Sequence, residues 1–234
     1  MPRLAQCITL LGYLLLAPRC LVCGERGLPK RDLCAACTQA LPWNDSSCNA
    51  CGLPMPLASP RCGQCQHRPP AFTRVRAAFR YEFPVDRLLP RFKFHGDLAA
   101  GALLAELMAS TLLRDDLPQA LVPVPLHHAR LRERGYDQAR ELARALGARL
   151  RVPVLPLLAR PVATAAQTRL GAAARRQNVR AAFHCRPGPL PGHVALVDDV
   201  MTTGATVHEC ADVLRRAGVA RVEVWVVARA AAPA

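Results

Sequence analysis

From about residue 71 onward, short apolar runs alternate with amphipathic stretches along the chain. The apolar runs predict strands at residues 75–83, 120–124, 194–197 and 221–228. The amphipathic stretches predict helices at residues 84–94, 97–113, 135–150 and 205–217. The run at 194–197 lacks polar alternation, as expected for a strand buried on both faces of a parallel sheet. The pattern therefore predicts an α/β domain with a mainly parallel sheet over residues 71–234.

The first 18 residues contain one arginine followed by an apolar run that includes Leu10, Leu11, Leu14 and Leu15. The run is shorter than the roughly 20 residues that span a bilayer, and no small-residue cleavage site follows it. We therefore predict an amphipathic helix docked on the protein, rather than a signal peptide or a membrane anchor. The protein is accordingly expected to be cytoplasmic and not an integral membrane protein.

Eight of the eleven cysteines form four C-x-x-C pairs, each beginning 14 residues after the previous one. Two C-x-x-C turns can complete a tetrahedral four-cysteine zinc site, so residues 19–68 predict a double zinc ribbon with two structural Zn²⁺ ions. In chain order the two ligand sets are Cys20, Cys23, Cys34 and Cys37, then Cys48, Cys51, Cys62 and Cys65. Interleaved sets also fit the spacing. An iron–sulfur cluster and a disulfide framework are the alternatives, and the disulfides would need an oxidising compartment.

The formal net charge of +14 indicates an anionic partner, such as a phosphate, a nucleotide, a nucleic acid or an anionic membrane surface. Part of this charge reflects an arginine-rich composition, so its position along the chain matters more than its total. Residues 130–186 alone hold 13 arginines against three acidic side chains. This concentration predicts a phosphate-facing surface in the middle of the second domain.

Residues 194–206 read VALVDDVMTTGAT, in which Asp198 and Asp199 follow the predicted strand. The turn that comes next leads into a predicted helix and consists of Thr202, Thr203, Gly204, Ala205 and Thr206. Backbone N–H groups and the dipole at a helix N-terminus favour an anion. The aspartates would repel a phosphate, so they are expected to face sugar hydroxyls or Mg²⁺. A phosphorylated sugar satisfies both halves of the motif. The alternative is a solvated acidic loop with a capping threonine.

This motif resembles the phosphoribosyl-pyrophosphate (PRPP) motif of type I phosphoribosyltransferases. The wider chain resembles the ComF family of competence and DNA-utilisation proteins, also called GntX in some bacteria. The segments that carry this resemblance are the cysteine-rich region, KFHGD (93–97), VPVPLHHARLRERGYDQA (122–139), TAAQTRLGAAARRQNVRAAF (164–183) and the PRPP motif. It implies a type I phosphoribosyltransferase-like domain that binds PRPP with Mg²⁺, with Asp198 and Asp199 as its catalytic residues. Asp137 departs from the family, which commonly reads RGFNQ where this chain reads RGYDQ.

The resemblance also implies roles for the basic segments. The basic loop after residue 124 is the counterpart of the pyrophosphate loop, with Arg132 and Arg134 at the phosphate, although a solvated helix face is the alternative. His127 and His128 are expected at the surface, and Lys93 is a candidate to reach the site. Residues 160–184 stand where this fold carries a mobile hood. Candidates for contact with nucleic acid are Arg130, Arg169, Arg175, Arg176 and Asn178.

Three functions fit these features. The first is a ComF-like protein that acts on single-stranded DNA in natural transformation or DNA utilisation, with PRPP in its pocket and other uptake proteins, such as a helicase, as partners. Because aromatic residues make up only 5% of the chain, and Tyr136 and Phe183 are the nearest stacking candidates, a phosphate-tracking mode is expected. The second is an active phosphoribosyltransferase with an unknown acceptor. The third is a PRPP-sensing regulator that catalyses nothing.

Overall fold

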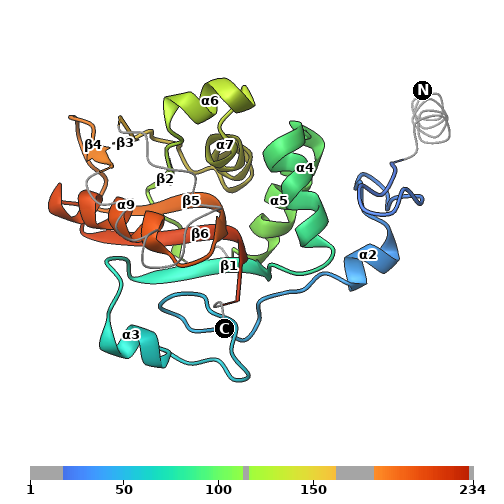
Figure 1. The fold of residues 1–234 in the computed structure, drawn as a ribbon, viewed down its shortest axis with the longest axis horizontal. Coiled ribbons are helices and arrows are strands. Elements are labelled where there is room, and N and C mark those ends of the chain that lie inside the picture. Colours follow the sequence, from blue (N-terminus) through green and yellow to red (C-terminus); the bar gives the residue numbers. More distant parts are fainter. Residues whose placement is uncertain (1–17, 113–115, 162–181, 232–234) are drawn as a thin grey trace, which may run out of the picture.

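The computed structural model describes residues 18–112, 116–161 and 182–231. Within them, helices flank a parallel sheet, and two groups of four cysteines precede it in the chain (Figure 1). The predicted α/β architecture with a cysteine-rich N-terminal region is therefore confirmed. The helix expected over residues 1–18 lies outside the described residues apart from its last position. No helix in the described part of the chain is long and apolar enough to cross a membrane.

The main sheet has four strands in the order β1-β6-β5-β2, and each neighbouring pair is parallel. These strands are β1 (Arg74–Arg80), β2 (Ala120–Pro123), β5 (His193–Met201) and β6 (Arg221–Arg229). The short strands β3 (Leu158–Ala159) and β4 (His184–Cys185) form a separate antiparallel pair. All the main strands run the same way, so their carboxyl ends lie along one edge of the sheet.

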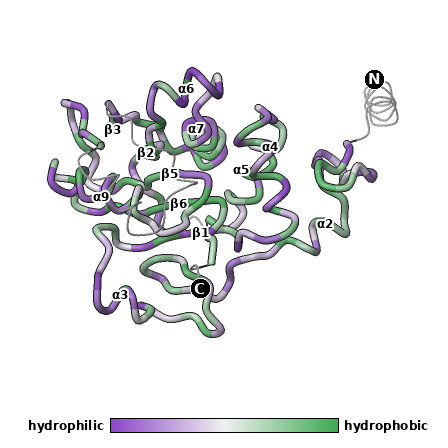
Figure 2. Tube along the Cα trace, viewed as in Figure 1, coloured by the Kyte–Doolittle hydropathy of each residue, from purple (hydrophilic) through white to green (hydrophobic). Residues whose placement is uncertain are grey.

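Alternate residues of β5 and β6 point to opposite faces of the sheet, because side chains along a strand alternate in direction. Ala195 and Trp225 pack into the core formed with the helices of one face. Those helices are α4 (Val85–His95), α5 (Leu98–Thr111) and α7 (Gln138–Leu150). Leu196 and Val224 pack on the opposite face, together with α9 (Ala205–Arg216). Both faces are thus covered, which explains why β5 and β6 are hydrophobic along most of their length (Figure 2).

Several predicted elements differ in extent or type from the structure. β5 continues through Asp198 and Asp199 to Met201, because β6 runs beside it and pairs Met201 with Arg229. β1 ends at Arg80, three residues earlier than predicted, where its own pairing with β6 reaches Arg229. The basic stretch after β2, expected to be a loop, forms α6 (His128–Arg134). No residue of α6 is buried and the helix is largely hydrophilic (Figure 2), so its sequence carries no apolar stripe that would reveal a helix.

The cysteine-rich region contains two short helices, α2 (Ala35–Gln39) and α3 (Gly63–His67). Its first cysteine group packs into the core on the side of α4 and α5, whereas its second group packs into the core that includes α9. Trp43 forms an isolated bridge with Phe79 of β1, and their ring centroids are 4.7 Å apart. The two cysteine groups therefore join the α/β domain on different faces of the sheet.

Candidate functional site

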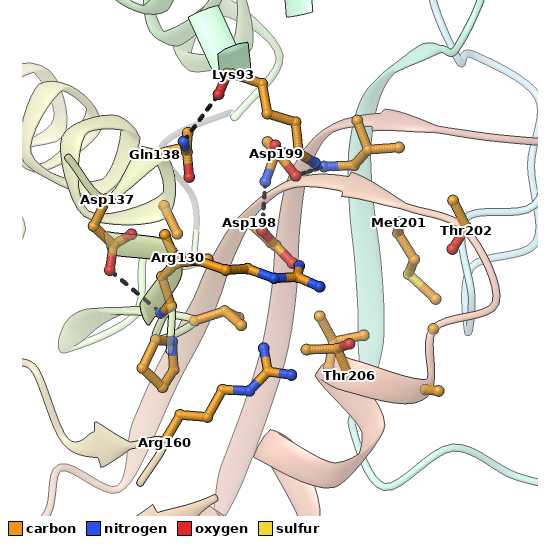
Figure 3. A pocket seen from close by; sticks show the side chains of 18 of the residues that line it. Lys93, Arg130, Asp137, Gln138, Arg160, Asp198, Asp199, Met201, Thr202 and Thr206 are labelled. Atoms are coloured by element: carbon orange, nitrogen blue, oxygen red, sulfur yellow. Dashed lines mark hydrogen bonds and ion pairs between the residues drawn. The ribbon is translucent and has the colours of Figure 1, made fainter. Parts of the chain in front are cut away.

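A cavity of about 120 Å³ opens at the carboxyl ends of β2 and β5 (Figure 3). Ligands of open parallel α/β sheets bind at this edge. Both predicted aspartates and all five residues of the predicted anion turn, 202–206, line the cavity. Lys93, Arg130, Arg134 and Arg160 bring positive charge to the same space.

The two aspartates point to different sides of the sheet, as their neighbouring positions in β5 require. Asp199 faces α4, where Lys93 Nζ lies 2.7 Å from Asp199 Oδ2. The expectation that Lys93 reaches the site is therefore confirmed. The Asp199 side chain is only 7% exposed, and its other oxygen accepts a hydrogen bond of 2.7 Å from Val200 N. This ion pair fixes α4 to the end of β5.

Asp198 faces the other side of β5. Burial, reinforced by the neighbouring Asp199 carboxylate, raises the pKa of Asp198 to about 8, while Lys93 acts in the opposite direction. One Asp198 oxygen accepts a hydrogen bond of 2.8 Å from Asp199 N. A carboxyl group that stays protonated because its pKa is raised ionises when a cation or several hydrogen-bond donors approach it. Two neighbouring carboxylates fit the oxygen ligands that Mg²⁺ prefers, and they equally fit sugar hydroxyls.

The turn between β5 and α9 has the features of an anion site. Gly204 precedes the first residue of α9 and has φ of 77°, a left-handed conformation that favours glycine. A Cβ atom at Gly204 would come within 2.5 Å of the terminal methyl group of Met201. Ala205 N donates to Thr203 Oγ1 at 3.4 Å. The 12-residue helix α9 follows, and Ala205, Thr206 and Val207 of its first turn line the cavity. The first backbone N–H groups of a helix have no partner within the helix and favour an anion.

The arginines of α6 divide into two kinds. Arg130 and Arg134 line the cavity, whereas Arg132 is exposed and does not. The Arg134 guanidinium also lies 5.2 Å from the ring centroid of Phe94, which is 59% exposed. The predicted grouping of Arg132 with Arg134 is therefore not what the geometry shows. Instead, the seven-residue helix presents Arg130 and Arg134, four residues apart, on one side.

Sequence reasoning did not single out Arg160, which approaches the cavity from beyond β3 (Figure 3). Burial lowers the pKa of Arg160, as does the positive charge of Arg130. The Asp198 carboxylate opposes this effect. The Arg160 guanidinium also lies 5.2 Å from the Phe183 ring centroid. Nothing distinguishes Arg160 in the sequence from the other arginines of its segment.

Asp137 and Gln138 tie the α7 start to two other parts of the site. Asp137 caps α7 by accepting from Arg140 N at 3.1 Å, and its other oxygen lies 3.4 Å from Leu126 N. Burial raises the pKa of Asp137. Gln138 Nε2 donates to Lys93 O at 3.2 Å. Asp137 thus acts here as a hydrogen-bond acceptor, a role that an asparagine oxygen could also serve.

Two expectations about ring side chains are wrong. His127 is 5% exposed rather than at the surface, because its Nδ1 caps α6 by accepting from Ala129 N at 3.2 Å. Phe183 is 2% exposed and therefore offers no free face for stacking. His128 is exposed, as expected. The other predicted nucleic-acid contacts lie outside the described residues; they are Arg169, Arg175, Arg176 and Asn178.

Each cysteine group brings four sulfur atoms within 4.8 Å of one another. The sets are Cys20, Cys23, Cys34 and Cys37, and Cys48, Cys51, Cys62 and Cys65, which follow chain order and are not interleaved. Sulfur–sulfur distances of 3.7 Å (Cys23–Cys34) and 3.8 Å (Cys51–Cys62) match the roughly 3.8 Å between ligands of a tetrahedral zinc–thiolate site. They are far longer than a disulfide bond of about 2.0 Å. The donor sets therefore fit two structural zinc ions.

Taken together, the strand-end cavity and the paired cysteine groups define an α/β protein with an appended double zinc ribbon. A family model described as a double zinc ribbon domain matches residues 11–66. Competence protein F of Haemophilus influenzae is 35% identical over 223 residues, which cover 91% of this chain and 97% of that protein. DNA utilization protein YhgH of Salmonella typhimurium is 35% identical, covering 84% of this chain and 90% of that protein. The chain belongs to the ComF family of competence and DNA-utilisation proteins.

Among solved structures, the chain is similar to an allosteric regulatory enzyme of purine biosynthesis, with a TM-score of 0.38 and 20% identity. The match covers 59% of this chain and spans 30% of the enzyme's length.

Proposed function

We propose that this protein handles single-stranded DNA during uptake or utilisation and binds PRPP, or a related phosphoribosyl ligand, with Mg²⁺ in the strand-end cavity. One observation carries the ligand: an anion turn, two carboxyl groups and three arginines line the same cavity. A phosphorylated sugar needs hydrogen-bond donors for its phosphate and hydrogen-bond acceptors for its hydroxyl groups, at separate points. This cavity offers both.

The residues divide between the parts of that ligand. Backbone N–H groups of residues 202–206 would bind the 5′-phosphate, with Gly204 allowing a close approach. Asp198 and Asp199 would accept from ribose hydroxyls or hold Mg²⁺, which offsets the charge of a diphosphate. Arg130 and Arg134 would donate to that diphosphate, because guanidinium groups form paired hydrogen bonds with phosphate oxygens. Lys93 holds the Asp199 carboxyl group in place through their ion pair.

The DNA-handling role is supported by family membership and by charge. The names of the relatives refer to competence and DNA utilisation. Arg132 and Arg144 are exposed, and Arg144 retains 66% of its side-chain surface. Such side chains bind a phosphate backbone without reading its sequence, and the few exposed aromatic residues favour this mode over base stacking. Recruitment of a helicase or of other uptake proteins remains a prediction.

An active phosphoribosyltransferase is the second candidate, favoured by the Asp198 carboxyl group. Its raised pKa lets it exchange a proton near neutral pH, which suits a group beside a reacting sugar. In such an enzyme a bond from C1 of ribose to pyrophosphate breaks and a bond from C1 to an acceptor forms. A sensor that binds PRPP without this step is the third candidate.

The deciding experiment is calorimetric titration of the zinc-loaded protein with PRPP and Mg²⁺, followed by an assay for released pyrophosphate with and without single-stranded DNA. Binding without release would support a DNA-handling protein or a sensor, whereas release that requires DNA would support an enzyme with a nucleic-acid acceptor. Asp198→Asn serves as the cavity variant and Arg144→Met as the surface control. If PRPP gave no heat of binding and did not displace ribose 5-phosphate from the protein, the proposed ligand would be wrong.

A further inference from the structure

Arg229, at the carboxyl end of β6, connects two parts of the molecule that are distant in sequence. Its side chain belongs to a residue that is only 5% exposed. Its Nε donates to the backbone oxygen of Cys51 at 3.0 Å. Its Nη1 donates to the backbone oxygen of Met201 at 3.2 Å and also to that of Thr202. One guanidinium therefore holds a zinc-ligand turn and the start of the anion turn together.

The cysteine turn around Cys51 and the anion turn are both closely packed, so neither can shift without moving Arg229. Gly52, next to Cys51, has φ of 67°, and a Cβ atom there would lie 2.9 Å from Val75 Cγ1. The cysteine turn thus presses directly on β1. On the other side, Gly204 packs closely against Met201. A small displacement of the cysteine turn would consequently move Arg229. The movement of Arg229 would in turn shift the Met201 and Thr202 carbonyl groups at the start of the anion turn.

Charge links the same two parts. A four-thiolate zinc site carries a net charge of −2, and Arg229 lies against one of its ligand turns with a permanent positive charge. A buried guanidinium is stable only when its donors are satisfied and its charge is compensated. Loss of the metal would remove that compensation and loosen the turn that supplies the Cys51 oxygen.

We propose that Arg229 is a positioning residue that couples zinc occupancy of the second cysteine group to the shape and anion affinity of residues 202–206. The identity of the anion rests on the proposed function, but the coupling itself does not. The first cysteine group meets the α/β domain elsewhere. Arg91 donates to Leu21 O, and Arg31 lies 2.7 Å from Glu106 of α5. Zinc in the first group should therefore have no comparable effect on the anion turn.

Two metal-site variants test this difference. Cys65→Ser disables the second group and Cys23→Ser disables the first, and each should lose about one zinc ion per chain. Hydrogen exchange measured by mass spectrometry should show faster exchange at residues 200–206 in Cys65→Ser, while Cys23→Ser keeps the wild-type rate there. Equal exchange in both variants would overturn the proposal. This readout needs no ligand, so it stands even if PRPP does not bind.

Arg229 itself is tested against Arg80, its register partner on β1, which is 45% exposed. Arg229→Met should release zinc from the second group to a chelator about tenfold faster and weaken PRPP binding about tenfold, whereas Arg80→Met should change neither. Arg229→Lys keeps the charge, so its zinc-release rate and its PRPP affinity should lie between those of Arg229→Met and the wild-type protein. Wild-type zinc release from the second group in Arg229→Met would contradict the proposal.

Because coupling is reciprocal, the wild-type protein provides a measurement that no misfolded variant can obscure. Saturating PRPP with Mg²⁺ should slow zinc loss from the second group and leave the first group unchanged. If PRPP binds but protects neither group, or both equally, the coupling is wrong. If PRPP does not bind, the proposed function fails, and the hydrogen-exchange and zinc-release experiments, which need no ligand, decide on Arg229.

Discussion

Lys93 of α4 and Asp199 of β5 form an ion pair of 2.7 Å that joins a covering helix to the sheet edge where the cavity opens. The pair has unequal exposure, because the side chain of Lys93 is 29% exposed and that of Asp199 only 7%. Removing the lysine would therefore leave an almost fully buried carboxylate without its cation. The KFHGD segment that carries Lys93 is thus part of the candidate site as well as of the fold.

We expect Lys93→Met and Asp199→Asn each to lower the free energy of unfolding by about 2 kcal/mol, since each leaves one partner poorly compensated. Urea denaturation of both variants and of the double variant measures the coupling between the two side chains. The double variant should lose less than the sum of the single losses. Additive losses would show that the pair contributes nothing beyond its separate side chains.

Unlike the two preceding substitutions, Asp198→Asn should raise the stability of the protein, and it should do so at high pH. The pKa of Asp198 is about 8 in the folded chain against a usual value of 3.8, so the unfolded chain binds fewer protons between these values. The wild-type protein therefore loses stability from this residue as the pH rises from about 4 to 8. At pH 8 the variant should be more stable by at least about 1 kcal/mol. Denaturation curves at pH 5 and 8 check this, and a less stable variant at pH 8 would contradict it.

The same residue predicts a proton signal on ligand binding. If Mg²⁺ or ribose hydroxyls meet Asp198, its carboxyl group ionises and releases a proton at pH 7. Calorimetric titrations with PRPP and Mg²⁺ in two buffers of different ionisation enthalpy should give different heats. Asp198→Asn should abolish the difference. Equal heats for the wild-type protein would separate Asp198 from the ligand.

Gly204 and Gly218 flank α9 and provide a matched pair of substitutions. Both have positive φ, 77° and 110°, but only Gly204 lies at the cavity. Each change to alanine should cost about 1 kcal/mol of stability through backbone strain. Only Gly204→Ala should also weaken PRPP binding, by about tenfold or more. Equal binding by both variants would argue against an anion at this turn.

The α6 arginines separate cavity binding from surface binding. Arg130→Met and Arg134→Met should weaken PRPP binding, because both side chains line the cavity, while the exposed Arg132→Met should not. Arg132→Met should instead reduce the salt dependence of single-stranded DNA binding, by about one in the slope of log affinity against log salt. Fluorescence anisotropy between low and moderate salt measures this slope. An unchanged slope would remove Arg132 from the DNA surface.

Metal removal should affect the cysteine-rich region before the sheet. The purified protein is expected to contain two zinc ions per chain, and a strong chelator should expose eight additional reactive thiols while residues 18–68 lose structure. Metal analysis combined with thiol titration follows both events. Disulfide bonds, seen as thiols that appear only after reduction, would contradict the zinc assignment.

The sequence predicted the parts of the fold that depend on local pattern. The strands and the larger helices follow apolar runs, and the cysteine spacing anticipated both metal groups. The end of β5 was placed too early because Asp198 and Asp199 interrupt the apolar run, although hydrogen bonds to β6 continue beyond them. The helix α6 was expected only as the alternative to a basic loop, because it has no buried face.

The site was only partly predictable because its members come from distant segments. The turn at 202–206 and the two aspartates form one continuous motif, so local chemistry identified them. Arg160 and Arg229 acquire their places only through the folded topology, one beyond β3 and the other beside Cys51. His127 was misplaced because capping a helix buries a side chain that composition alone assigns to the surface.

The position of β6 has a consequence for synthesis. This strand follows β1, β2 and β5 in the chain, yet it lies between β1 and β5 in the sheet. Until residues 221–229 leave the ribosome, β1 has no partner in the main sheet, and both it and β5 present bare hydrogen-bonding edges. The cysteine groups can bind zinc much earlier, since all their ligands precede β1. A nascent chain stalled before residue 221 would therefore be metal-loaded at one end and prone to aggregate at the other.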